Sequence, residues 1–219
     1  MKQLIQSYKT GELRLVEVPI PQLRRGFVLV KTRASLVSIG TKKYMIEMAR
    51  KSLIGKALAR PDLLKQVIAK VRTEGLTEAY RQAMGRLDTP VPLGYSAAGV
   101  VVEVGPEVEG LSVGDPVAIT GSGYAGHAEY NLTPALLTVK IPKEKITYEE
   151  AAFGALGGIA LEAVRMARVQ IGDQVAVIGL GLLGQIAVQL LASAGCHVIG
   201  MDISKDKVEL ALGHGMELG

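Results

Sequence analysis

The sequence predicts an α/β protein in which a β-rich part is followed by the first half of a doubly wound parallel sheet. Short alternating apolar runs, bounded by glycine and proline, fill much of residues 1–150. After about residue 150, helical patterns and apolar runs alternate, which is the order of a parallel βαβ unit. A glycine-rich turn joins the first of these later strands to the helix that follows it.

The first part is expected to form a small, partly closed β-barrel with a helical insertion. An alternating run over 13–18 and an apolar run over 28–32 predict its first strands. Residues 43–88 follow a helical pattern, with apolar residues recurring on one face. Further strands are expected over 99–105, 115–119, 128–130 and 136–141. We place the boundary near residue 150, which gives domains of 1–150 and 151–219.

The segment from Val175 to Asp202 is the most informative. Its apolar run 175–178 enters Gly179-Leu180-Gly181-Leu182-Leu183-Gly184, a helical pattern follows, and a second apolar run ends on Asp202. Two of the glycines permit a tight turn and a close approach of a pyrophosphate, and the third lets the helix pack on the strand. The helix N-terminus adds unpaired N–H groups. The expected phosphate-binding residues are therefore Gly179, Gly181, Leu182, Leu183 and Gly184.

Asp202 is expected to bind the ribose of an adenine nucleotide. It lies 23 residues after Gly179, close to the spacing of about 20 that is typical of this acidic residue. Its carboxylate would repel a 2′-phosphate, so NAD is favoured over NADP. The alternative for the glycine pattern alone is a tight strand-to-helix turn that binds nothing. The flanking strands, the helix and Asp202 favour nucleotide binding.

A complete domain of this kind needs about six strands. Between Gly172 and Gly219 the sequence offers only two strand candidates. We therefore expect this Rossmann-type half to be truncated and the chain to be a fragment, so that any activity belongs to the whole protein.

Composition excludes several classes of protein. The chain is 48% hydrophobic but has no uninterrupted apolar run of the length of a membrane helix, and its N-terminus lacks the pattern of a secretory signal, so a cytoplasmic protein with no membrane partner is expected. Cys196 is the only cysteine, which excludes an internal disulfide and a multi-cysteine zinc site. We expect Cys196 to be a small buried residue.

Positive charge is concentrated in one segment. Residues 43–86 carry ten Lys and Arg against four Asp and Glu, a net +6, whereas the whole chain has a net charge of +4. No recognition-helix motif accompanies these charges, so no nucleic acid partner is expected. The segment either attracts an anionic substrate or forms the solvated face of helices that dock on another domain.

Several motifs recur in order along the chain and carry a resemblance to a known family. They are Pro92-Leu93-Gly94-Tyr95-Ser96-Ala97-Ala98-Gly99, Gly114-Asp115-Pro116-Val117, Ala128-Glu129-Tyr130, Glu150-Ala151-Ala152, the turn from Gly179 to Gly184, and Asp202 to Lys207. In this order the sequence resembles the medium-chain dehydrogenase/reductase superfamily. The resemblance implies a GroES-like β-barrel catalytic domain followed by a Rossmann domain, a nicotinamide cofactor in the cleft, and hydride transfer. It also implies that Asp202 and Lys207 hold the adenosine ribose.

The chain departs from the zinc-using members of this superfamily at the positions of their zinc ligands. Where those members carry cysteine, histidine or carboxylate ligands, this sequence has Ile39, Tyr95 and, by spacing, Gly154. These side chains cannot supply a zinc coordination sphere. We therefore predict a protein that binds no metal.

Within the superfamily, the chain looks most like the N-terminal part of bi-domain oxidoreductases. The long helical segment after Gly40-Thr41, the block around Tyr95, and Leu156-Gly157-Gly158-Ile159 carry this finer resemblance. Such proteins carry a downstream dehydrogenase domain of the Gfo/Idh/MocA type and are often associated with carbohydrate metabolism.

Without zinc, hydride transfer still needs a group that moves a proton. Thr41 resembles the proton-relay hydroxyl of the family, and Tyr95 occupies a zinc-ligand position from which its phenol could donate a proton. The alternatives are a turn threonine and a tyrosine that fills the space of the metal. His127 titrates near neutrality, yet a structural histidine beside a strand fits the pattern better.

The sequence therefore predicts an NAD-dependent, zinc-independent oxidoreductase that acts on a small, carbohydrate-derived or other alcohol or carbonyl substrate. An NADPH-dependent reductase of the enoyl or quinone type is one alternative, and a non-catalytic NAD-binding module is another. The sequence leaves open the substrate, whether the protein is a homo-oligomer, and whether a second dehydrogenase domain is fused downstream.

Overall fold

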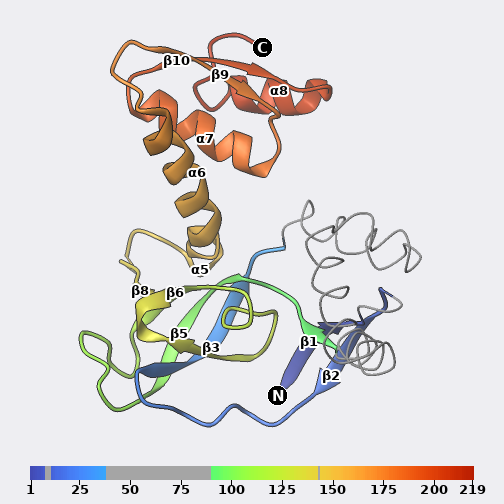
Figure 1. Cartoon of the computed structure of the whole chain (residues 1–219), viewed down its shortest axis with the longest axis vertical. Helices are drawn as coiled ribbons and strands as arrows, with labels where there is room; N and C mark the ends of the chain where they lie inside the picture. The colour runs from blue at the N-terminus through green and yellow to red at the C-terminus, as the bar shows by residue number, and fades with distance from the viewer. Residues whose placement is uncertain (8–10, 38–89, 143) are drawn as a thin grey trace, which may run out of the picture.

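The chain forms a β-rich part and an α/β part that lie at opposite ends of the molecule (Figure 1). The computed structural model describes residues 1–7, 11–37, 90–142 and 144–219. The helical pattern expected over 43–88 and the candidate Thr41 lie outside the described residues. Two helices, α5 (Tyr148–Ala151) and α6 (Gly154–Ala167), join the two parts.

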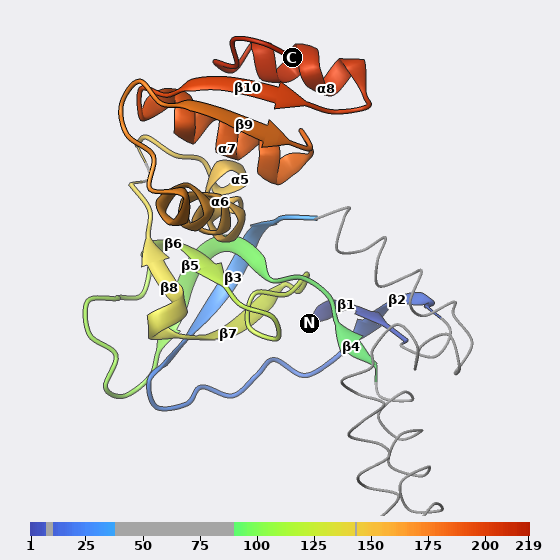
Figure 2. The same cartoon turned by 45° about the horizontal axis from the view of Figure 1, so that its top comes forward.

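The β-rich part consists of two antiparallel sheets. The larger has the order β7-β3-β5-β6-β8 and the smaller the order β2-β1-β4. In the described residues, an isolated bridge between Gln3 and Ala128 and the backbone hydrogen bonds beside it link the two sheets, and Figure 2 shows the smaller sheet beside the larger. Their strands are β1 (Lys2–Gln6), β2 (Leu13–Glu17), β3 (Phe27–Ser35), β4 (Val91–Pro92), β5 (Ser96–Val104), β6 (Pro116–Thr120), β7 (Tyr130–Pro134) and β8 (Thr138–Lys140), with a 3-10 turn at Ala135–Leu137.

The larger sheet curls around an aliphatic core. Register shifts between β3 and β5 occur at Leu29/Val30 and at Thr32/Ala34, and bulges of this kind bend a strand and increase its twist. The buried side chains of the core are Val28, Val30, Ala97, Val101, Val117, Ile119 and Ala125. The curled sheet agrees with the barrel that the sequence predicts.

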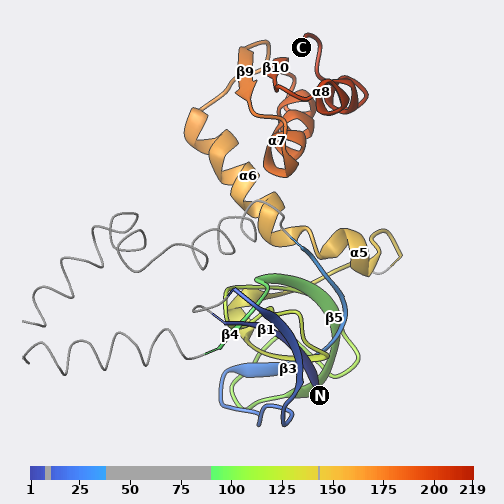
Figure 3. The ribbon, with the colours of Figure 1, turned by 90° about the vertical axis from the view of Figure 1, so that its right-hand side faces the viewer.

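The α/β part contains two parallel strands and the helices that cover one face of them. Strand β9 (Gln174–Ile178) pairs with β10 (His197–Met201), helix α7 (Leu182–Ser193) connects the two strands, and α8 (Lys205–Leu212) follows. Helix α7 packs against both strands and against α6 (Figure 3). On the other face of the strands, Ile178 and Met201 are exposed.

The buried face of α7 differs from the one expected from its apolar pattern. We expect Ile186, Leu190 and Leu191 to be buried, but only Leu191 is, together with Val188 and the polar Gln185. The apolar pattern predicts a different inward face for the helix because the polar Gln185 occupies one of the inward positions. Cys196, 6% exposed, lies in the same core as Leu180, Val188 and Val198, as predicted.

A capped corner joins the two parts. Helix α5 begins with a capping box, in which the Thr147 hydroxyl accepts from the Glu150 N–H and the Glu150 carboxylate accepts from the Thr147 N–H. The Ser96 hydroxyl at the start of β5 donates to the Ala152 carbonyl at 2.6 Å and accepts from the Ala155 N–H at 3.3 Å. Ser96 is 1% exposed, and its hydroxyl binds the corner between α5 and α6 to the sheet beside the buried apolar contacts of Ala98, Ala151 and Ala152.

Among the helices of the described ranges, none is long and apolar enough to cross a membrane.

Replacing Ser96 with alanine should destabilise the protein by about 1–3 kcal/mol, because the buried Ala152 carbonyl and Ala155 N–H lose their partner. Chemical denaturation measures this change. Ser112→Ala is the matched control, since Ser112 is exposed and its loss should alter stability by less than about 0.5 kcal/mol. Equal stability of the two variants would contradict the role of Ser96.

Candidate functional site

The glycine turn between β9 and α7 has the geometry that the sequence predicts. Gly179 has φ +93°, which side-chain-bearing residues rarely adopt, and its N–H donates to the Met201 carbonyl at 2.7 Å. A Cβ at Gly184 would lie 2.1 Å from the Gly179 carbonyl oxygen. The helix therefore packs this closely on the end of the strand only with glycine at 184.

The N-terminus of α7 is open. Gly181 is its N-cap, with no side-chain cap and no acidic residue in the first turn. Within the described part of the chain, the N–H groups of Gly181, Leu182 and Leu183 have no hydrogen-bond acceptor. A Cβ built on Gly181 would meet no atom within 4 Å. The turn thus offers unpaired donors beside free space, a combination that suits an anionic group.

Asp202 lies directly beside this turn, just after the end of β10. Its Oδ2 accepts from the Leu180 N–H at 2.8 Å and its Oδ1 from the Ser204 N–H at 2.9 Å. The Lys207 Nζ stands 3.4 and 3.5 Å from the same two oxygens. The structure therefore brings the predicted turn, Asp202 and Lys207 together.

Hydrogen bonding keeps Asp202 charged. The pKa of the Asp202 carboxyl lies below its usual range. The largest cause is the hydrogen bond from the Ser204 N–H, followed by the one from the Leu180 N–H and by the Lys207 ammonium. The Asp202 side chain is only 8% exposed. The site consequently holds one fixed negative charge at neutral pH, a few ångströms from the open helix N-terminus.

Apolar side chains stand around the same edge. Residue Ile178 ends β9, Met201 is its register partner in β10, and Ile203 follows Asp202. Ile178 is 82% exposed and Ile203 is fully exposed. These side chains lie at the carboxyl ends of parallel strands, where ligands of open α/β sheets bind.

The predicted catalytic residues are only partly described. Thr41 lies outside the described residues. Tyr95 is half-buried between β4 and β5, and its carbonyl accepts from the Gly121 N–H at 2.9 Å. The His127 N–H donates to the Leu93 carbonyl at 2.7 Å, so His127 lies next to the segment that carries Tyr95.

Two polar residues near these sites are not among those predicted from the sequence. The Ser35 hydroxyl at the end of β3 lies 2.9 Å from His127 Nδ1, a contact for which the local sequence holds no signal. Gln185, buried in the first turn of α7, contacts the glycine turn. Its position one residue after Gly184 and on the same face as Val188 could have indicated this contact.

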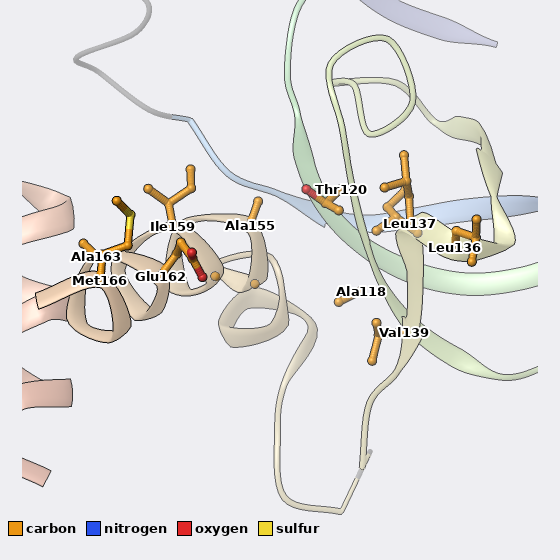
Figure 4. Close-up of a pocket in the computed structure, with 13 residues that line it drawn as sticks. Ala118, Thr120, Leu136, Leu137, Val139, Ala155, Ile159, Glu162, Ala163 and Met166 are labelled. Atoms are coloured by element: carbon orange, nitrogen blue, oxygen red, sulfur yellow. The ribbon is translucent and has the colours of Figure 1, made fainter. Parts of the chain in front are cut away.

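A separate groove of about 740 Å³ lies between α6 and strands β6 and β8. Figure 4 shows Ile159 and Met166 of α6 on one side and Ala118, Leu137 and Val139 on the other. Its lining is largely apolar and includes none of the predicted site residues.

Over the described ranges, no group of three or more His, Cys, Asp or Glu side chains could hold a metal ion. The expectation of a metal-free protein stays a prediction.

Comparison with known proteins identifies the first part of the chain. Residues 64–143 match the alcohol dehydrogenase GroES-like domain. An alcohol dehydrogenase of Geobacillus stearothermophilus is 30% identical over 212 residues, which cover 81% of this chain and 62% of the relative. D-guloside 3-dehydrogenase of Escherichia coli is 34% identical over 134 residues, covering 57% of this chain and 35% of the relative. The chain thus spans at most about three fifths of the length of these relatives.

Solved structures match the whole of the chain. A mycobacterial quinone oxidoreductase is 26% identical with a TM-score of 0.71, covering 100% of this chain and 57% of that one. A mycobacterial protein in complex with NADPH is 25% identical with a TM-score of 0.72, covering 100% of this chain and 58% of that one. The GroES-like match, the named relatives and the shared fold support the resemblance to the medium-chain dehydrogenase/reductase superfamily, and they agree with a GroES-like domain followed by Rossmann-type strands and helices.

Proposed function

We propose that the protein is an NAD-dependent oxidoreductase that transfers hydride between nicotinamide and a small alcohol or carbonyl substrate. The observation that carries this proposal is the pairing of an open helix N-terminus with the ionised Asp202 beside it. Together they offer donors for a pyrophosphate and an acceptor for ribose hydroxyls. The named relatives, an alcohol dehydrogenase and D-guloside 3-dehydrogenase, support hydride-transfer chemistry.

The residues of the turn fit a dinucleotide. The N–H groups of Gly181, Leu182 and Leu183 would donate to the pyrophosphate, which would occupy the space that a side chain at 181 would fill. Ribose hydroxyls would donate to Asp202 in place of the long contacts from Lys207. The exposed Ile203 would pack against the adenine base, which needs an apolar surface.

The charge of Asp202 favours NAD over NADP. A 2′-phosphate would bring two negative charges against an ionised carboxylate that already accepts from two backbone N–H groups. The ribose hydroxyl of NAD instead donates a hydrogen bond to that carboxylate. The preference follows from this difference between repulsion and hydrogen bonding.

The bound nicotinamide supplies or accepts the hydride. A proton must also leave or reach the substrate oxygen, and we propose Thr41 and Tyr95 as the hydroxyl groups that move it.

Neither hydroxyl group requires a metal, and Ile39, Tyr95 and Gly154 stand where zinc-using members carry ligands. We propose accordingly that the protein belongs to the zinc-independent branch and that its substrate is carbohydrate-derived, as the similarity to D-guloside 3-dehydrogenase supports. The finer sequence resemblance also supports a downstream Gfo/Idh/MocA-type domain in the whole protein.

A second candidate is an NADPH-dependent reductase of the quinone or enoyl type. The similarity to a mycobacterial quinone oxidoreductase and to a mycobacterial structure with NADPH favours it. Calorimetry with both cofactors, followed by assays on secondary alcohols, ketones and enones, separates the two candidates. Tighter NADP binding and turnover of enones alone would select the second. Binding of neither cofactor would exclude both.

Replacing Asp202 with asparagine should weaken NAD binding roughly tenfold or more, because hydroxyl groups bond more strongly to a carboxylate than to an amide. It should weaken NADP binding less, so the ratio of the two affinities should move toward NADP. Calorimetric titration measures both. Asp206→Asn is the control, since Asp206 is exposed in the first turn of α8 and should leave the ratio unchanged. An unaltered ratio in Asp202→Asn would refute the assignment.

Asp202 should also contribute stability that depends on pH. Its pKa is lower in the folded chain than the value of about 3.9 expected in the unfolded chain. Its contribution is therefore complete above about pH 5, and it is lost as the pH falls through the lowered folded pKa. Urea unfolding of the unaltered protein and of Asp202→Asn from pH 7 to pH 3 should show a difference that is constant at first and shrinks in acid. A difference that grows in acid would contradict this account.

Loss of the proposed proton-transfer hydroxyls should lower turnover. Tyr95→Phe and Thr41→Val should each reduce kcat by about 10²–10⁴-fold, the contribution typical of a general acid–base group, with little change in NAD affinity. Steady-state kinetics on the best alcohol substrate measure this. Tyr124→Phe, an exposed tyrosine of the same domain, serves as the control. Full turnover in both variants would remove these two residues from the mechanism.

A further inference from the structure

Gln185 is a buried polar residue in the first turn of α7. It is 8% exposed and belongs to the same inward face as Val188 and Leu191. Polar side chains at such positions are retained inside a protein only where they make hydrogen bonds. The partners of Gln185 therefore indicate what the side chain does.

The amide nitrogen of Gln185 bonds to the glycine turn. Its Nε2 donates to the Leu180 carbonyl at 3.2 Å. This carbonyl belongs to the same planar peptide unit as the N–H of Gly181, and in a trans peptide the two groups point in opposite directions. Gln185 holds the Leu180 carbonyl on its own, buried side and so leaves the Gly181 N–H on the opposite side of the peptide. Within the described residues this N–H has no acceptor, and a Cβ on Gly181 would meet no atom within 4 Å.

The second hydrogen of the same amide binds another element. The Gln185 Nε2 also donates to the Lys207 carbonyl, in the first turn of α8, at 2.8 Å. The side chain of Lys207 reaches Asp202, whose carboxylate accepts from the Leu180 N–H. One amide group thus ties the glycine turn to the helix that follows the ribose-binding carboxylate.

The orientation of the amide is fixed, and its oxygen is left without a donor. Within the described ranges, no hydrogen-bond partner reaches the Gln185 Oε1. Rotating the amide would bring this oxygen against two carbonyl oxygens, so Nε2 must face them. An unpaired buried acceptor lowers the stability of the folded chain. The amide is therefore suited to holding the two carbonyls rather than to maximising stability.

We infer that Gln185 is a positioning residue that aims the Gly181 N–H at the pyrophosphate of the nucleotide. This inference depends on the proposed NAD binding. It assigns to Gln185 a larger effect on the phosphate part of the ligand than on the adenosine part, which contacts other residues.

Gln185→Met tests the inference, because methionine keeps the length of the side chain and removes both donors. Gln189→Met is the matched control. Gln189 lies one turn further along α7, is exposed, and donates only to the Gln185 carbonyl at 3.1 Å. Equilibrium dialysis of the purified protein measures binding of NAD and of adenosine, which lacks the pyrophosphate. Thermal melting verifies that each variant is folded.

The expected result is a loss of NAD affinity of about tenfold in Gln185→Met. Adenosine affinity should stay within about twofold of that of the unaltered protein, because adenosine lacks the pyrophosphate. A twofold change in affinity is less than the loss of one typical hydrogen bond produces. Gln189→Met should bind both ligands as the unaltered protein does. Unchanged NAD binding in Gln185→Met would overturn the inference, and so would an equal loss for NAD and adenosine, which is what a general structural role predicts. Failure of the unaltered protein to bind NAD would instead overturn the proposed function itself.

Discussion

The hydrogen bond between the Asp202 carboxylate and the Leu180 N–H is the interaction on which the candidate site depends. It joins the loop after β10 to the loop after β9 at 2.8 Å, and the Gly179 N–H joins the same two loops at 2.7 Å through the Met201 carbonyl. These bonds place a fixed negative charge beside a helix N-terminus. The Asp202 carboxylate can accept hydrogen bonds from ribose hydroxyls, and the N-terminus of α7 can donate them to phosphate oxygens. The two groups lie close enough for one nucleotide to reach both.

The site also depends on the close packing of the helix on the strand end. Because Gly184 lacks a side chain, α7 begins close to the Gly179 carbonyl, and a Cβ on Gly181, its N-cap, would meet no atom within 4 Å. In the other half of the molecule, Ser96 holds the corner between α5 and α6 against β5. Buried Ala98, Ala151 and Ala152 pack together at the same corner, so both a hydrogen-bonding side chain and apolar contacts hold α5 against the sheet.

The local order of the site could be predicted from the sequence, because a turn, a helix start and a strand end are each encoded by neighbouring residues. The glycine spacing and Asp202 predicted the elements that β9, α7 and β10 form. The contact of Gln185 with the Lys207 carbonyl could not be predicted, since it depends on where this carbonyl lies after folding. Likewise, Ser96 shows no sequence signal for its role, because its partners are more than fifty residues further along the chain. The two-residue strand β4 is too short to produce a periodic pattern.

The single cysteine has a practical consequence. Cys196 is shielded within the core of the α/β part, with its Sγ 3.6 Å from the Gln170 carbonyl. Since the chain has no other thiol, thiol-specific reagents react with the chain only when this core opens. The rate of labelling therefore reports the opening of the α/β part, without any engineered probe.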